Sequence, residues 1–118
     1  MPDLITMLGT VDVPVEAGGP NADRIVDGNP QHRTWNAYVS PDEKTYAGIW
    51  ESTPGCWRIT YDEWEFCHII SGVSVLSNED GGQTTVKAGD AFTISPGFRG
   101  TWRVVETTRK HYVIRLPD

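Results

Sequence analysis

Turn-forming residues interrupt the chain at short, regular intervals from residue 34 onward, and this spacing limits its fold more than any other feature. Proline, glycine, asparagine and aspartate gather about every eight to twelve residues, and the segments between them are short and rich in β-branched and aromatic residues. No segment sustains the roughly 3.6-residue apolar period of an amphipathic helix over three turns. The pattern predicts an all-β sandwich or barrel of jelly-roll type. The expected strands lie near 34–39, 45–51, 56–61, 65–70, 73–77, 83–87, 91–94, 101–105 and 110–115.

The first third of the chain has a different character. Residues 1–34 hold several prolines and glycines and few periodic apolar positions, which predicts an irregular N-terminal arm. A valine-rich piece at 10–15 could add an edge strand to the sheet. A length of 118 residues suffices for one core but not for two, so we expect a single barrel over residues 35–118.

The charge balance excludes several classes of partner. Ten Lys and Arg side chains oppose sixteen Asp and Glu side chains, giving a net charge of -6. This charge argues against attraction to nucleic acid or to anionic lipid. No apolar run approaches the roughly 20 residues of a membrane span, and the first four residues lack the basic-then-apolar start of a secretion signal. We therefore expect a cytoplasmic protein with no nucleic-acid or membrane partner.

Two motifs in the second half of the chain carry a family resemblance. In the first, Glu65 is followed by six residues and Gly72; in the second, Gly89-Asp90 leads through a short apolar strand into Pro96-Gly97. With their flanking segments, these motifs resemble the small cupin family named for the cupin domain of (S)-ureidoglycine aminohydrolase, over residues 45–115. The resemblance implies a double-stranded β-helix, the cupin jelly-roll barrel. The segments that carry it are 48–51, 54–58, 65–72, 88–91, 96–102 and 109–113.

The resemblance also implies an activity, but the implied metal ligands are mostly missing. The named enzyme releases ammonia from ureidoglycine with a manganese ion, and it has two barrels. Its ligand positions, two histidines and a glutamate followed by a glutamine, fall here on Ile59, Tyr61, Glu65 and either Gly100 or Thr101. Only Glu65 is a good metal ligand, whereas a transition-metal site needs about three or four protein donors. We therefore expect no metal and no other cofactor.

The alternation of side chains along a strand predicts what the barrel contains instead. If Glu65 points inward, Cys67 and Ile69 share its face, and a neighbouring strand contributes further inward positions. The aromatic rings either fill the barrel as a solid core or line an apolar pocket for a small molecule. The residues expected to bind such a ligand are Trp50, Trp57, Trp102 and Tyr112.

An inward-facing carboxylate needs a partner, because burying an unpaired charge is costly. The candidate partners of Glu65 are Lys110, Tyr61 and Arg58. A Glu65–Lys110 pair would be either a structural ion pair or an acid–base couple that moves protons on a small imine, amine or carbonyl compound. The candidate catalytic residues are therefore Glu65, Lys110 and Tyr61.

The cysteines and histidines give weaker signals. Cys56 and Cys67 would lie roughly opposite each other if residues 61–62 formed a hairpin turn, so a disulfide is conceivable; the alternative is two reduced, apolar core residues. Cys67 and His68 cannot share a zinc ion, because neighbours on a strand point to opposite faces. His68 and His111 are expected to face away from the pocket.

Three functions remain open at this level. The sequence favours a metal-free barrel that binds a small molecule, with weak deaminase, lyase or isomerase activity in nitrogen or amino-acid metabolism. The alternatives are a metal-dependent enzyme similar to ureidoglycine aminohydrolase, and a non-catalytic structural or regulatory barrel. Because Trp64, Phe66 and Ile70 are expected to face outward on one strand, we also predict a symmetric homodimer.

Overall fold

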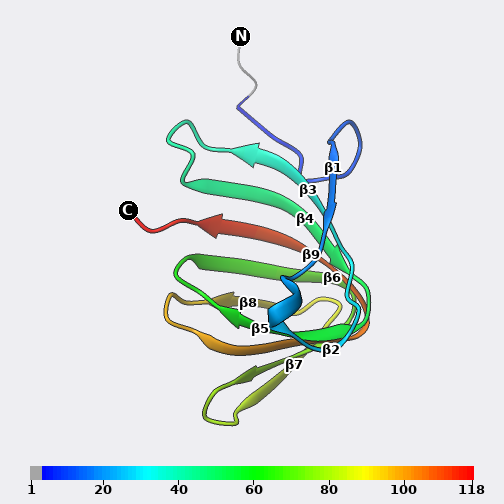
Figure 1. Ribbon diagram of the computed structural model, residues 1–118. Coiled ribbons are helices and arrows are strands. Elements are labelled where there is room, and N and C mark those ends of the chain that lie inside the picture. The colour runs from blue at the N-terminus through cyan, green and yellow to red at the C-terminus, as the bar shows by residue number, and fades with distance from the viewer. Residues whose placement is uncertain (1–3) are drawn as a thin grey trace.

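The computed structural model describes residues 4–118 and shows an antiparallel β barrel with no α-helix in this range (Figure 1). The all-β jelly-roll fold predicted from the spacing of the turns is therefore confirmed. The elements, in chain order, are β1 (Val15–Gly18), the 3-10 turn η1 (Ala22–Arg24), β2 (Ile25–Gly28), β3 (His32–Val39), β4 (Thr45–Ser52), β5 (Gly55–Thr60), β6 (Trp64–Asn78), β7 (Gln83–Lys87), β8 (Ala91–Ile94) and β9 (Arg99–Arg115).

Two long strands, β6 and β9, run through both sheets of the barrel and pair with each other along most of their length. One sheet contains β1, β3, β4, the C-terminal half of β9, the N-terminal half of β6, and β8. The other contains β2, β5, the N-terminal half of β9, the C-terminal half of β6, and β7. In Figure 1, β3, β4, β9 and β6 form the ladder at the left, and the same long strands then curl into the lower sheet.

The bend in β6 occurs at Gly72. This residue has a φ of 92°, and a Cβ at this position would lie 2.1 Å from the carbonyl oxygen of Thr107 on β9. Only glycine allows this approach. The pairing of β6 with β9 shifts register around Ser71 and Val73, so the chain bulges here without ending the strand. The sequence predicted separate strands at 65–70 and 73–77 because a bulge and a turn use the same residue types.

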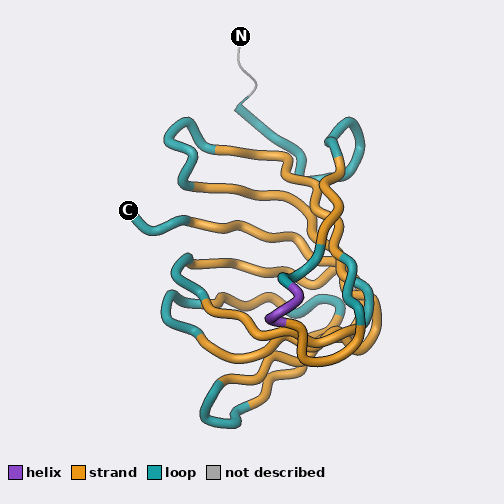
Figure 2. Tube along the Cα trace, viewed as in Figure 1, coloured by secondary structure: helices purple, strands orange, loops and turns teal. Residues whose placement is uncertain are grey.

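The N-terminal arm is more ordered than the sequence indicated. Residues 1–34 were expected to be irregular, with an edge strand at 10–15; the described part instead contains β1, η1 and β2. β1 pairs with β3, β2 pairs with β5, and Arg58 of β5 donates a hydrogen bond to the carbonyl of Asp23 in η1. Figure 2 shows this segment, with the short η1 turn, lying against the barrel. These strands form because β3 and β5 offer unpaired edges, which a local pattern does not reveal.

The connection between β5 and β6 differs from the expected hairpin. β5 pairs with β2 and β9, whereas β6 pairs with β7, β8 and β9, so β5 and β6 do not pair, and the N-terminal half of β6 that follows β5 lies in the other sheet. Cys56 and Cys67 are therefore not cross-strand neighbours, and both are buried free cysteines. The predicted inward face nevertheless holds, because alternation along each strand does not depend on which strand is its neighbour.

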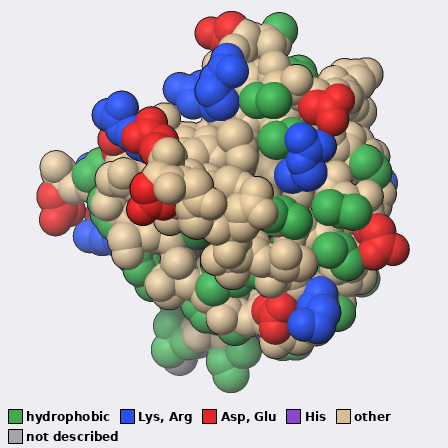
Figure 3. Space-filling view, turned by 90° about the horizontal axis from the view of Figure 1, so that it is seen from below, with side chains coloured by type: hydrophobic (Ala, Val, Ile, Leu, Met, Phe, Trp, Pro, Cys, Tyr) green, Lys and Arg blue, Asp and Glu red, His purple; other side chains and the backbone are tan. Residues whose placement is uncertain are grey.

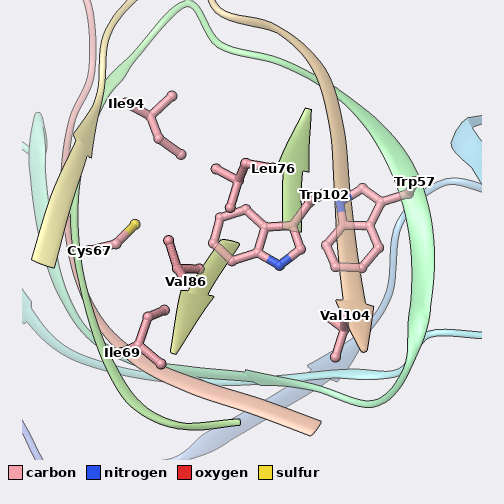
Figure 4. Close-up of a cluster of buried hydrophobic side chains, with 8 residues drawn as sticks. All are labelled: Trp57, Cys67, Ile69, Leu76, Val86, Ile94, Trp102 and Val104. Atoms are coloured by element: carbon pink, nitrogen blue, oxygen red, sulfur yellow. The ribbon is translucent and has the colours of Figure 1, made fainter. Parts of the chain in front are cut away.

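The apolar core lies in the barrel interior between the two sheets. Its side chains come from five strands and meet in the barrel interior (Figure 4). The indole N–H of Trp102 donates to Ser74 Oγ at 3.1 Å, and Ser74 shares a 2.7 Å hydrogen bond with Thr108, so these three polar side chains within the core have partners. The core residues are Trp57, Cys67, Ile69, Leu76, Val86, Ile94, Trp102 and Val104.

The outer surface mixes charges of both signs. Figure 3, which views the molecule from the side of the β6–β7 hairpin, shows Lys and Arg side chains next to Asp and Glu side chains with apolar side chains between them. No helix within residues 4–118 is long and apolar enough to cross a membrane.

Candidate functional site

A pocket of about 440 Å³ opens between the inner face of the first sheet and strand β5. Strands β1, β3, β4, β5, β6 and β9 all contribute to its wall. The interior of the barrel is thus divided between a solid core and a cavity, and the two share the side chains of Trp57 and Trp102. The lining residues are Glu16, His32, Thr34, Asn36, Tyr46, Trp50, Trp57, Ile59, Tyr61, Glu65, Trp102, Lys110, Tyr112 and Ile114.

A buried ion pair forms the floor of this pocket. Lys110 Nζ on β9 lies 3.0 Å from Glu65 Oε2 on β6, and these side chains are only 5% and 3% exposed. The Tyr61 hydroxyl donates to the other carboxylate oxygen of Glu65 at 2.5 Å. Lys110 Nζ also lies 3.5 Å from Cys67 Sγ. The structure therefore brings together the three residues predicted to do chemistry, whereas their catalytic role stays a prediction.

The surroundings of Lys110, Tyr61 and Cys67 set the protonation state of each of these side chains. Burial alone would lower the pKa of Lys110, but the charges and hydrogen bonds of Glu65 and Cys67 outweigh burial and raise it. Burial and the neighbouring carboxylate raise the pKa of the Tyr61 hydroxyl well above its ordinary value. Burial also raises the pKa of the Cys67 thiol to about 12. At neutral pH the floor thus presents an ammonium ion, a phenol and a thiol, none of them in its nucleophilic form.

Aromatic rings form the walls above the floor. The Lys110 ammonium lies 4.4 Å from the ring centre of Trp102 and 4.6 Å from that of Trp50. Trp57 stacks on Trp102 with a centroid distance of 6.5 Å. The Tyr112 hydroxyl donates to Asn36 Oδ1 at 2.6 Å. All four residues predicted as ligand-binding on aromatic grounds therefore line the pocket, and a cation–π contact adds to the ion pair.

His32 is a pocket residue that the sequence analysis missed. Its ring packs against Trp57 at 4.7 Å and Trp50 at 5.1 Å, and no described residue hydrogen-bonds its buried Nε2 atom. Burial, followed by the charge of Lys110, lowers the pKa of His32 to about 4, so the imidazole is neutral at pH 7. A buried nitrogen without a hydrogen-bond partner is rare in folded proteins, and such an atom often pairs with a water molecule or a ligand. Here it lies at the wall of a cavity that a ligand could enter.

The other missed residues come from the arm and from β3 and β4. Glu16 on β1 is exposed at the pocket mouth, and Thr34, Asn36 and Tyr46 line the upper wall. One signal could have found part of this set: residues 32, 34 and 36 alternate along one strand, so they share a face. Glu16 could not be found in this way, because only the pairing of β1 with β3 places it there.

Several other candidates lie away from the pocket. Arg58, a candidate partner of Glu65, is directed toward η1. His68 and His111 are cross-strand neighbours that stack on each other, with Nδ1 atoms 3.2 Å apart, and neither lines the pocket. This placement agrees with the expectation that both face away from it.

The side chains present do not fit the implied manganese site. Of the positions that the resemblance assigns to ligands, Ile59 and Tyr61 do line the pocket with Glu65, but Gly100 and Thr101 border a different surface depression. Both oxygens of the carboxylate already accept hydrogen bonds from neighbouring side chains. Among the residues that the structure describes, no three His, Cys, Asp or Glu side chains are grouped to hold a metal. The donor set is therefore too small for a transition metal.

Comparison with known proteins assigns the barrel to a sequence family. The model of the EutQ-like cupin domain matches residues 39–112, which include the pocket strands from β4 to most of β9. No curated protein sequence matches the chain significantly.

Solved structures give the same picture. A protein of unknown function of the DUF861 family from Pseudomonas syringae has a TM-score of 0.78 and 26% identity, and the match covers 87% of this chain but 45% of that one. The chain thus spans less than half of that protein. A DUF861 family protein from Thermotoga maritima is 38% identical over 54% of this chain and 73% of that one, with a TM-score of 0.53. The EutQ protein of Clostridium difficile is 20% identical, with a TM-score of 0.66 over 84% of this chain and 74% of that one, a likeness of fold alone.

The ion pair generates a first prediction. Lys110→Met leaves a buried carboxylate without its cation, so we expect a loss of about 3–5 kcal/mol in the free energy of unfolding. The double variant with Glu65→Leu should regain much of that loss, because no charge is then left unpaired. Urea unfolding of the wild type, the two single variants and the double variant gives the coupling energy. Lys87→Met, at an exposed lysine, is the control and should change stability little. A coupling energy of zero would contradict the paired floor.

His32 generates a second prediction, about pH. Its folded-state pKa of about 4 lies below the unfolded value of about 6.5, so the folded state binds fewer protons between these values. The stability due to neutral His32 is present above about pH 6.5 and is lost as the pH falls toward 4. Urea unfolding at about pH 7 and about pH 4.5 should show a larger loss for the wild type than for His32→Phe. Equal losses in both proteins would show that His32 does not titrate in this way.

Proposed function

Because the chain belongs to the EutQ-like cupin domain family, we propose that it is a cupin that binds a small organic molecule in the pocket above Glu65 and Lys110. The cupin fold predicted from the two sequence motifs supports this, since the barrel contains a pocket of about 440 Å³ that a ligand can enter. The proposal concerns this chain alone, because it spans less than half of the Pseudomonas syringae protein.

The observation that carries the proposal is a set of polar atoms that face the cavity without partners. Among the residues that the structure describes, nothing hydrogen-bonds His32 Nε2, and the hydroxyl groups of Thr34 and Tyr46 line the cavity with no side-chain hydrogen bond. The unpaired, buried Nε2 atom of His32 would be unexplained in a solid core, because buried polar groups are nearly always paired. An apolar pocket with a few convergent polar groups is the usual form of a small-molecule site.

The floor supports binding more directly than it supports catalysis. A general base must reach a proton of the substrate with a free lone pair. The two oxygens of Glu65 already accept hydrogen bonds from Tyr61 and Lys110. Proton transfer of the deaminase, lyase or isomerase type would require one of these partners to release the carboxylate. We therefore propose binding as the function, with acid–base turnover as a further step that needs this release.

The two alternative functions have less support. A metal-dependent reaction like that of ureidoglycine aminohydrolase needs a donor set that the described residues do not supply. A non-catalytic barrel that acts only through its surface leaves the pocket and its unpaired polar atoms without a role.

We also propose that the protein is a symmetric homodimer formed through the outer face of β6. Trp64 on this face is 36% exposed, and Phe66 and Ile70 on the same face are partly exposed. Large exposed apolar side chains on so small a chain favour an interface. The outer surface also holds a compact group of opposite charges, Arg33, Glu51 and Arg109, which a self-complementary interface can use.

The binding proposal is tested by filling the pocket. Thr34→Phe places a ring in the cavity and should abolish binding, whereas Thr85→Phe, at an exposed site on another strand, should not. A panel of small water-soluble metabolites is screened by thermal unfolding; a ligand at about ten times its Kd stabilises the protein by about 1.4 kcal/mol, or about 5 °C. A supporting compound raises the melting temperature of the wild type and of the Thr85→Phe variant but not that of the Thr34→Phe variant. The proposal fails if the panel contains no such compound.

The dimer proposal is tested by light scattering. We expect a mass close to twice the 13.1 kDa of one chain at micromolar concentration. Trp64→Lys should lower this mass toward that of a monomer, because it places a charge in the interface. Val105→Lys, which changes a 51% exposed valine elsewhere on the surface, is the control and should leave the dimer intact. A wild-type mass of one chain would refute the dimer.

A further inference from the structure

We propose that the ligand of this pocket carries a protonated amino group, bound at the mouth near Glu16, and an apolar body that lies against the tryptophans. This inference rests on the proposed binding function and specifies its ligand class. It follows from the charges that line the cavity, from the acceptor atoms at its mouth and from the aromatic rings between the mouth and the floor.

The charges at the pocket do not balance without a ligand. Among the residues that the structure describes, three charged side chains line it: Glu16, Glu65 and Lys110. The last two neutralise each other at 3.0 Å. Glu16 has no ion pair and no side-chain hydrogen bond with any residue that the structure describes, and its charge is close enough to Tyr112 to help raise the pKa of that hydroxyl. The pocket therefore has one carboxylate in excess, located at its mouth.

A ligand anion would find no free cation in the pocket. The Lys110 ammonium is directed at Glu65 and at Cys67, and two indole rings cover it, so its side chain is only 5% exposed. His32 is neutral at pH 7 because burial keeps its pKa at about 4. No arginine lies among the lining residues within the described part of the chain. A carboxylate or phosphate ligand would meet the excess charge of Glu16 with no compensating partner.

An ammonium group, in contrast, matches the groups at the mouth. It donates up to three hydrogen bonds and accepts none. The carboxylate of Glu16 and the hydroxyl oxygen of Thr34, its direct cross-strand partner, can accept them. The surrounding aromatic faces also attract cations.

The aromatic rings between the mouth and the floor limit the shape of the rest of the ligand. The rings of Trp50, Trp57 and His32 line the cavity and pack against one another, and the Nε2 atom of His32 has no partner among the described residues. A flat or apolar body suits these walls, and one polar group on it can pair with the imidazole. The class is therefore an amine with an apolar body, in which the ammonium points toward solvent and Glu16.

Three compounds with the same body and different charges test this inference. 2-Phenylethylamine is positive, 2-phenylethanol is neutral and phenylacetate is negative at pH 7. Isothermal titration calorimetry at low salt should give the amine at least tenfold tighter binding than phenylacetate, with the alcohol between them. Glu16→Gln should weaken the amine about fivefold and leave the alcohol unchanged, since only the charge interaction is removed. Glu106→Gln, at an exposed glutamate outside the pocket, should change neither affinity.

The outcomes distinguish failure of the proposed ligand class from failure of the proposed binding function. If phenylacetate binds as tightly as the amine, or if Glu16→Gln has no effect on the amine, the ligand class is wrong while binding in the pocket stands. If none of the three binds but other metabolites stabilise the protein in a way that Thr34→Phe abolishes, the ligand class is again wrong. If nothing binds in either experiment, the proposed function itself fails.

Discussion

The ion pair between Glu65 and Lys110 is the interaction on which the rest of the interior depends. Two charges held 3.0 Å apart at 5% exposure or less are costly to bury, so they persist only with further partners. Tyr61 supplies a hydrogen bond to one member, and the rings of Trp50 and Trp102 supply cation–π contacts to the other. The aromatic walls therefore stabilise the charge, and the charge in turn keeps the walls in position.

The two long strands explain how these residues meet. Glu65 lies on β6 and Lys110 on β9, which pair directly, so 45 residues of chain separate two side chains on adjacent strands. The bend at Gly72 sends the far half of β6 into the second sheet, and β9 also passes between the sheets, so both strands contribute side chains to the apolar core. The same two strands thus carry both the polar floor of the pocket and part of the apolar core.

The position of the lysine has a chemical consequence for the pocket. The cationic centre of this barrel is a side chain of the protein, held by Glu65 close to the positions Ile59 and Tyr61 that the family resemblance assigns to metal ligands. An ammonium donates hydrogen bonds and has no vacant coordination site, so it can orient a ligand but cannot activate a bound water as a metal does. This difference favours ligand binding over hydrolysis as the function of the site.

The sequence alone determined the fold class, the inward face of Glu65 and the aromatic character of the interior. It could do so because turn spacing and alternation along a strand are local properties. The tertiary structure alone decided that β5 does not pair with β6, that the arm adds two strands, and that His32 and Glu16 reach the pocket. These features depend on which distant strands pair, and pairing is set by the packing of the whole barrel.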